Sequence, residues 1–166
     1  MVEPTIDERY RGPWPAVNDL IAVEFDRYLT DAERPELRSA ITGCAPWTGD
    51  ELTAHIVETF GRFSAMLTRA RAGDFTPPFE RDGLSAENHR AVVDFDRDPV
   101  AALRPAVEGF CSAATDPEEP MAHQFGPIPV GLQAAFGLAE LALHHLDLVA
   151  PSGEVYRPDD DLVAVR

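Results

Sequence analysis

Glu140 and His144, near the C-terminal end of the sequence, are the residues whose types and spacing are best suited to chemistry. An α-helix turns by about 100° per residue, so residues four apart lie about 40° apart on one face. Asp147 returns to within about 20° of Glu140 and can orient a ligand or hydrogen-bond the backbone, whereas His145 points elsewhere. Imidazole and carboxylate groups on one face can bind a divalent cation. The spacing therefore indicates either a metal site or an ordinary polar pair.

A third protein ligand has to come from another part of the chain. The remaining histidines are His55, His89 and His123, and the spacing alone does not select His55 among them. Two histidines and one carboxylate would leave one position of a zinc ion open for catalysis. Glu58, one turn after His55, is either an acceptor for the N–H of a ligand or an exposed carboxylate. Arg62 shares the face of His55 and is either a binding residue for an anionic substrate or thiol cofactor, or a solvated arginine.

The strongest local helix signal lies close to His55. Thr48, followed three residues later by Glu51, predicts a capping box in which each side chain accepts from a backbone N–H of the first turn. Trp47 before the cap predicts a hydrophobic staple with the fourth helical residue, and we interpret it as a core residue rather than a substrate platform. The helix is predicted to end at Gly73.

The rest of the chain also has the periodicity of helices. Further helices are predicted over residues 17–28, 98–114 and 130–150, with shorter ones over 32–41 and 86–95 and proline-rich loops over 73–83 and 116–129. The last helix is apolar nearly all round, which predicts that it occupies the centre of the fold. These features predict an all-α protein built as a four-helix bundle. We assign the bundle to residues 1–153 and an acidic tail to residues 154–166.

Composition limits the classes of partner. The 166 residues include 14 basic residues, all arginine, and 29 acidic ones, which gives a formal net charge of −15. Such a charge disfavours binding to nucleic acid and to anionic membranes. The polar first fifteen residues predict no secretory signal, and no segment has the composition of a membrane span. We expect a cytoplasmic protein in which Cys44 and Cys111 are reduced and are small buried residues.

Two segments resemble one known family. The stretch from Cys44 to His55, CAPWTGDELTAH, is similar to the segment C-P-G-W-T-x-x-D-L-x-x-H-L of the mycothiol-dependent maleylpyruvate isomerase N-terminal family, part of the DinB-like superfamily. The stretch from Glu140 to Leu148, ELALHHLDL, resembles the E-x-x-x-H-x-x-D-L helix of the same family. The two segments occur in the same order and at a suitable separation, and the resemblance covers roughly residues 15–153.

The resemblance implies a DinB-like four-helix bundle with His55, Glu140 and His144 as ligands of a divalent metal, usually zinc. It also implies a homodimer as one form of assembly, and mycothiol, the small thiol of actinobacteria, as a co-substrate. A metal cation stabilises the thiolate form of a bound thiol, and the thiolate is the nucleophile. We therefore expect transfer of the thiol to a small electrophile, or isomerisation of that electrophile by addition and loss of the thiol.

Two alternatives remain open at this point. One is a metal-dependent enzyme that uses no thiol, such as a hydrolase, lyase or cyclase of a biosynthetic pathway. The other is a non-catalytic bundle that binds a metal or another ligand. The sequence also departs from the family, because Ala45-Pro46 replaces Pro-Gly before the tryptophan. With about 13 residues after Gly153, we expect that the second domain of the isomerase has no counterpart here.

Overall fold

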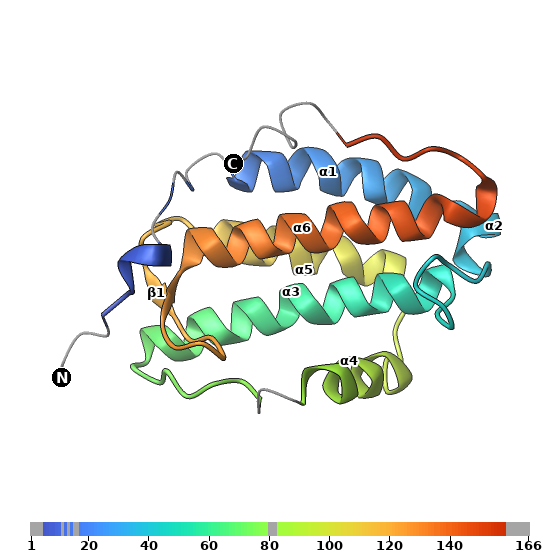
Figure 1. Cartoon of the computed structure of the whole chain (residues 1–166). Helices are drawn as coiled ribbons and strands as arrows, with labels where there is room; N and C mark the ends of the chain where they lie inside the picture. The colour runs from blue at the N-terminus through green and yellow to red at the C-terminus, as the bar shows by residue number, and fades with distance from the viewer. Residues whose placement is uncertain (1–4, 11, 13, 15–16, 80–82, 159–166) are drawn as a thin grey trace.

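Four long helices lie side by side and carry the core of the protein. The computed structural model describes residues 5–10, 12, 14, 17–79 and 83–158. Its long helices are α1 (Val17–Ala32), α3 (Gly49–Arg71), α5 (Pro99–Ala113) and α6 (Val130–Val149). In Figure 1, α1 and α6 run in one direction and α3 and α5 in the other. The predicted all-α four-helix bundle is confirmed.

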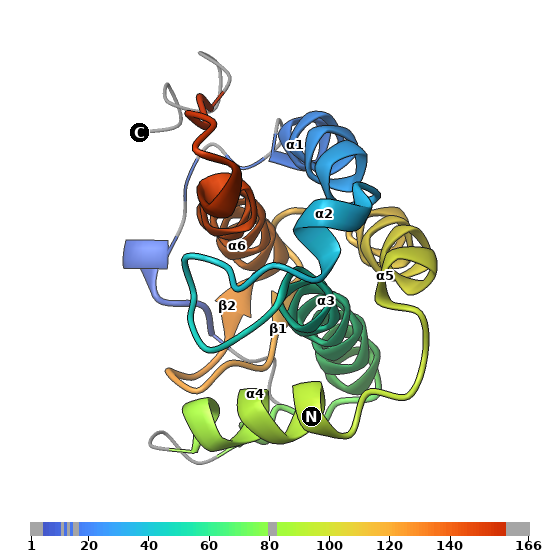
Figure 2. The same cartoon turned by 90° about the vertical axis from the view of Figure 1, so that its right-hand side faces the viewer.

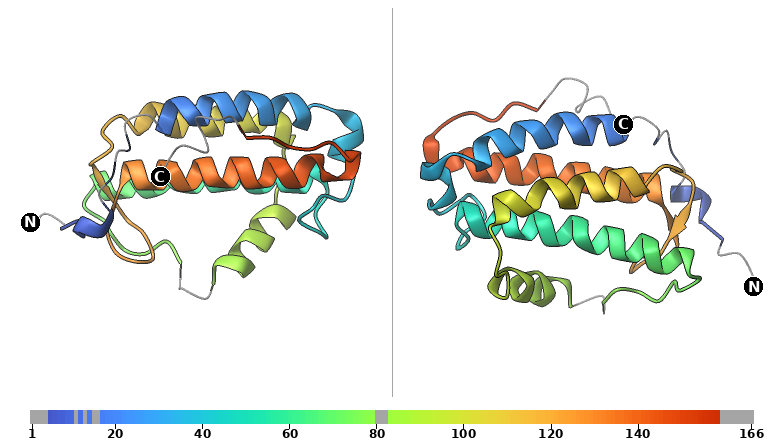
Figure 3. Two further views of the ribbon diagram at one scale, coloured as in Figure 1. Left: turned by 45° about the horizontal axis from the view of Figure 1, so that its top comes forward. Right: turned by 180° about the vertical axis from the view of Figure 1, so that it is seen from behind.

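Shorter elements close the ends and one side of the bundle. They are η1 (Glu8–Tyr10), α2 (Pro35–Arg38), α4 (Leu84–Val93), η3 (Ala150–Ser152), and the strands β1 (Pro120–Met121) and β2 (Ile128–Pro129). The two strands pair antiparallel within the segment that we predicted as a loop, and they are too short to produce an alternating sequence pattern. The views of Figure 3 show α4 beside the bundle, next to α3.

The starts of α3 and α5 follow from local sequence. Thr48 Oγ1 accepts a hydrogen bond from the Glu51 N–H at 3.3 Å, and Glu51 Oε2 accepts from the Thr48 N–H at 2.8 Å, so the predicted capping box is present. After the helix, Gly73 has φ 82°, a conformation that favours glycine. Asp98 caps α5 by accepting from the N–H of Val100 at 3.0 Å.

Aromatic side chains fill the space between α3 and α5. Phe60, Phe63 and Phe110 lie with their ring centroids 5.5 to 5.9 Å apart, and none of them is more than 8% exposed. Such edge-to-face and tilted contacts add to the stability gained from burying apolar surface. On the other side of the bundle α1 packs against α6, as the end-on view in Figure 2 shows.

The prediction that α6 occupies the centre of the fold is wrong. In Figure 2 this helix forms one corner of the bundle. Its side chains Phe136, Leu143 and Leu146 are 40, 62 and 49% exposed. Each helix of a four-helix bundle keeps an outer face, so an apolar outer face does not make a helix central. Among the residues that the structure describes, no helix is long and apolar enough to cross a membrane.

A buried polar cluster joins α6 to α1 and to the segment that follows η3. Glu24, which is fully buried, lies with Oε1 2.6 Å from His145 Nδ1, and the same oxygen accepts from the Tyr156 hydroxyl at 2.8 Å. His145 Nε2 lies 2.9 Å from Asp31 Oδ2. Glu154 also pairs with Arg34 at the start of α2, so described residues of the tail assigned from the sequence contact both α1 and α2; residues 159–166 lie outside the described part.

The capping box should contribute measurably to stability. We expect Thr48→Ala to lower the free energy of unfolding by about 1 kcal/mol, because the N–H groups of the first turn lose an acceptor. Urea unfolding followed by circular dichroism measures the change. Thr68→Ala, the same substitution at an exposed position of α3 whose hydroxyl donates to the Ser64 carbonyl, is the matched control and should change stability by less than about 0.5 kcal/mol. Equal effects of the two substitutions would contradict the assignment.

Candidate metal centre

The antiparallel arrangement of α3 and α6 brings three predicted site residues together. The first half of α3 carries His55, and the second half of α6 carries Glu140 and His144. His55 Nε2 lies 3.3 Å from Glu140 Oε2, and His144 Nε2 lies 3.3 Å from the same oxygen. The two imidazole rings stand nearly perpendicular, with their centroids 5.1 Å apart. Residues that are 85 positions apart in sequence thus share one small cluster.

The spacing of these donor atoms suits a tetrahedral metal ion. Bonds of about 2.0 to 2.2 Å to a tetrahedral zinc ion separate neighbouring ligand atoms by roughly 3.3 to 3.6 Å. Both nitrogen–oxygen distances match this separation, and one ligand atom from each of the three residues lies within 4.8 Å of the others. Two imidazoles and one carboxylate are also a donor set that suits zinc. His55, Glu140 and His144 could therefore hold such an ion and leave one position open.

In the cluster, the carboxylate of Glu140 and the imidazole of His144 each favour the charged form of the other. Burial by itself would raise the pKa of Glu140, but hydrogen bonds from His144 and His55 outweigh it and hold this pKa at about 2. Burial would lower the pKa of His144, and its contacts with Glu140 and Asp147 reverse the direction, so that this pKa is raised. The cluster therefore contains a carboxylate that stays ionised across the physiological range, which a metal ligand requires.

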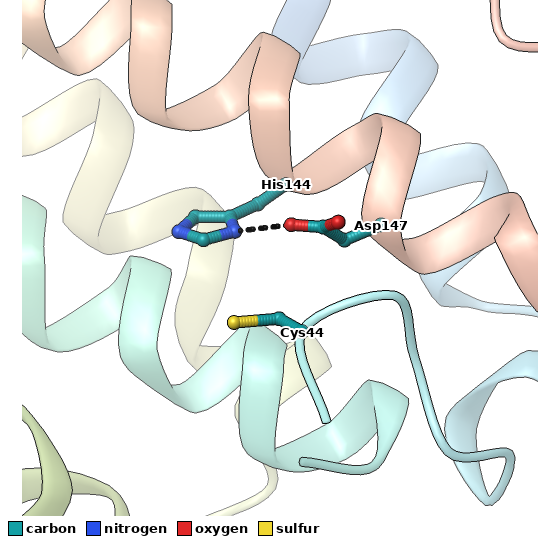
Figure 4. Close-up of side chains that lie close together, drawn as sticks. All are labelled: Cys44, His144 and Asp147. Atoms are coloured by element: carbon teal, nitrogen blue, oxygen red, sulfur yellow. Dashed lines mark hydrogen bonds and ion pairs between the residues drawn. The ribbon is translucent and has the colours of Figure 1, made fainter. Parts of the chain in front are cut away.

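Asp147 contacts the other nitrogen of His144, as Figure 4 shows. Its Oδ2 lies 3.1 Å from His144 Nδ1, so Asp147 can accept a hydrogen bond from the Nδ1–H and orient the ring with Nε2 facing the cluster. The loop before α3 approaches closely at this point, with the Gly43 N–H donating to the Asp147 carbonyl at 2.9 Å. A Cβ atom at Gly43 would lie 2.6 Å from Asp147 Oδ1, so a larger residue there would have to displace the Asp147 carboxylate.

Cys44 belongs to the same neighbourhood, which sequence reasoning missed. Its sulfur, a ring nitrogen of His144 and an oxygen of Asp147 lie within 4.8 Å of one another, and Figure 4 shows the sulfur beside the imidazole. Cys44 is half-buried, and burial together with Asp147 and Glu140 raises the pKa of its thiol. The only sign in the sequence that Cys44 lies near the site was that it begins the first segment that resembles the known family. Two overlapping donor sets thus share His144.

The donor cluster lies at the wall of a cavity of about 320 Å³. His55 and Glu140 line it together with Arg62, whose guanidinium donates to Asn88 Oδ1 at 3.0 Å. Glu58 does not contact the three donor residues but pairs with Arg97 at 3.3 Å, so the interpretation of Glu58 as an acceptor for a ligand has no support among the described contacts. Other lining residues are mostly apolar and come from α3, α6, α4 and the segments before α4 and α6: Phe63, Met66, Phe79, Leu84, Phe125 and Phe136.

Trp47 has a part in the site besides its place in the core. Its ring lies 5.2 Å from that of His55, centroid to centroid, and it packs against the hydrophobic core. Of the two histidines that the sequence left as alternatives, His89 is exposed and lies outside the donor cluster. His123 lines the cavity, and burial lowers the pKa of its imidazole.

The fold and the site together define a helical bundle with a two-histidine, one-carboxylate cluster beside a cavity. The chain belongs to the family of the mycothiol maleylpyruvate isomerase N-terminal domain, whose model matches residues 19–149. This match includes His55, Glu140 and His144 and confirms the resemblance seen in the sequence. No curated protein matches the sequence significantly.

A solved structure shares the fold. The crystal structure of the mycothiol-dependent maleylpyruvate isomerase is similar with a TM-score of 0.65 at 15% sequence identity. The similarity covers 82% of this chain and 61% of that chain, so this protein corresponds to less than two thirds of the length of the isomerase. At this identity the likeness establishes the bundle architecture.

The tetrahedral spacing predicts which of the two donor sets binds zinc. We expect about one zinc per chain by elemental analysis, lost in His55→Ala and retained in Cys44→Ser, because Cys44 belongs only to the second set. His144→Ala should also lose the ion, since both sets contain His144. His89→Ala, an exposed histidine, is the matched control. Loss of zinc in Cys44→Ser with retention in His55→Ala would place the ion in the other set.

Proposed function

We propose that this protein is a zinc-dependent enzyme that uses mycothiol, or a related thiol, to attack a small electrophile. The observation that carries the proposal is that two histidine nitrogens, from α3 and α6, each lie 3.3 Å from Glu140 Oε2 at the wall of a cavity. Membership of the family supports the choice of thiol, because the solved neighbour is named as mycothiol-dependent. The reaction is either transfer of the thiol or isomerisation.

The three donors would hold the ion, and the side chains around them would keep it in place. A divalent ion bound there would lower the pKa of a coordinated thiol, so that the nucleophilic thiolate is available at neutral pH. Asp147 positions His144 by accepting from Nδ1, which leaves Nε2 free as a donor atom. Trp47 packs against the ring of His55 and limits its rotation.

The cavity would bind the second reactant, the electrophile. His55 and Glu140 line it, so a molecule bound in the cavity lies next to the proposed ion. Much of its wall is apolar, which suits an electrophile with an apolar body. In transfer, the carbon–sulfur bond that forms stays in the product; in isomerisation the same bond forms, the electrophile rearranges, and the bond breaks to release the thiol.

Dependence on thiol separates this proposal from a metal enzyme that uses none. We expect the zinc-loaded protein to convert at least one of a panel of small electrophiles, maleylpyruvate among them, only when mycothiol is present. Chromatography of the products and titration of the free thiol measure the reaction: thiol consumed one for one indicates transfer, and thiol recovered indicates isomerisation. His144→Ala should lower the rate to the uncatalysed level, whereas His89→Ala should not. Conversion at the same rate without thiol would refute the proposal.

Removal of the metal should leave the bundle folded. The aromatic core between α3 and α5 is buried independently of the donor cluster, so we expect a chelator to leave the helical circular dichroism signal largely unchanged while zinc is released. The measurement distinguishes a catalytic ion from a structural one. Cooperative loss of the helical signal on chelation would favour a non-catalytic, metal-stabilised bundle instead.

A further inference from the structure

The cavity beside the donor cluster contains an arginine that forms no ion pair with any described residue. Arg62 is half-buried and its guanidinium donates to the neutral Asn88 Oδ1 at 3.0 Å, 5.5 Å from the centroid of the Phe79 ring. Among the residues that the structure describes, no carboxylate lies within 4.0 Å of it, whereas exposed Arg97 pairs with Glu58. Burial lowers the pKa of Arg62, which nevertheless remains a cation at neutral pH. A partly desolvated cation of this kind is stabilised by an anion in the cavity.

Unpaired acceptors lie in the wall of the same cavity. Gln133, on α6, is 2% exposed, and its Oε1 has no hydrogen-bond partner within the described part of the chain. Gln124 Oε1, in the segment between β1 and β2, is likewise buried and without a partner. Leaving a buried carbonyl oxygen without a donor destabilises the fold. Both residues line the cavity, so a ligand that carries an O–H or N–H group can satisfy them.

We propose that this cavity binds a small monocarboxylate that also carries a hydroxyl or amide N–H group, with the carboxylate on Arg62 and the donor group on Gln133. The inference rests on the proposed function, since it describes the electrophile that would lie beside the thiol. One carboxylate matches the one arginine of the described lining, and the sequence contains no lysine. The neutral His123 adds no second positive charge at neutral pH, because burial lowers the pKa of its imidazole.

The size and walls of the cavity suit a flat, largely apolar body. Its volume of about 320 Å³ is at the lower end of the range for ligand pockets. Phe63 and Phe136 line it from the neighbouring helices α3 and α6, so a ring or conjugated chain can pack against aromatic side chains from both. The aromatic walls position the apolar body, and the polar groups fix its two ends.

Binding of simple aromatic acids to the zinc-loaded protein tests the proposal without any turnover. The probes are benzoate, 3-hydroxybenzoate and isophthalate, measured by isothermal titration calorimetry in the absence of thiol. We expect 3-hydroxybenzoate to bind more tightly than benzoate, and isophthalate, which replaces the hydroxyl by a second carboxylate, to bind more weakly than 3-hydroxybenzoate. Arg62→Gln should weaken binding of 3-hydroxybenzoate at least tenfold.

Two further variants separate a binding role from a structural one. Arg97→Gln makes the same change of charge at an exposed arginine outside the cavity lining, and it should leave the affinity within twofold. Gln133→Leu keeps the apolar volume and should abolish the advantage of 3-hydroxybenzoate over benzoate, with the affinity for benzoate retained. Thermal unfolding of each variant checks that the fold is intact, and Arg62→Lys, which retains the charge, should restore part of the affinity if Arg62→Gln is unstable.

The outcomes distinguish this inference from the proposed function. Affinity for 3-hydroxybenzoate that is unchanged in Arg62→Gln and is lost in His144→Ala would show that the acid binds the metal alone and would overturn the inference. If isophthalate bound more tightly than 3-hydroxybenzoate, the assignment of the ligand as a monocarboxylate would be wrong. Binding that depends on Arg62 in a protein without thiol-dependent turnover would support this inference while refuting the proposed reaction.

Discussion

The register between α3 and α6 is the constraint on which the site depends. Glu140 Oε2 meets a nitrogen from each helix at 3.3 Å only because the two helices approach closely beneath the site. Gly137 permits this approach, since a Cβ atom there would lie 3.1 Å from Cζ of Phe60. The aromatic core that Phe60 shares with α5 then fixes α3 from its other side. Apolar packing therefore sets the distances between the polar donors, which isolated helices would not hold.

The consecutive histidines of α6, His144 and His145, lie in different environments because they point to different sides of the helix. One residue corresponds to about 100° of rotation, so His144 faces α3 and the loop before it, while His145 faces α1. His145 is buried between Glu24 and Asp31 and is closed to a ligand by its own hydrogen bonds. His144 shares an oxygen of Glu140 with another histidine and borders a cavity-lining residue. The first arrangement joins elements of the bundle, and the second leaves donor atoms available.

The bundle and the segments around it have different roles in the candidate site. The donors of the cluster are on α3 and α6, whose packing is dictated by the core. The same two helices line much of the cavity, and α4, the segment before it and the segment between β1 and β2 complete the lining with residues such as Asn88, Phe79 and Gln124. Changes in those segments can alter the ligand without disturbing the cluster, because few core residues lie in them. The three donor residues thus lie on two bundle helices, whereas the wall of the cavity is shared between those helices and the segments around them.

Sequence alone determined the helices, their caps and the shared face of Glu140 and His144, because these depend on residues a few positions apart. It also indicated the family, whose two segments are local patterns. Helical spacing left the third histidine open and the family resemblance implied His55; only the tertiary structure brought it beside Glu140 and His144, placed Cys44 next to them, and put α6 at a corner rather than the centre. It likewise revealed that Arg62 contacts a neutral amide in the cavity wall and that Gln133 Oε1 lacks a hydrogen-bond partner among the described residues. Such facts depend on which faces of distant helices meet, and packing of the whole core determines that.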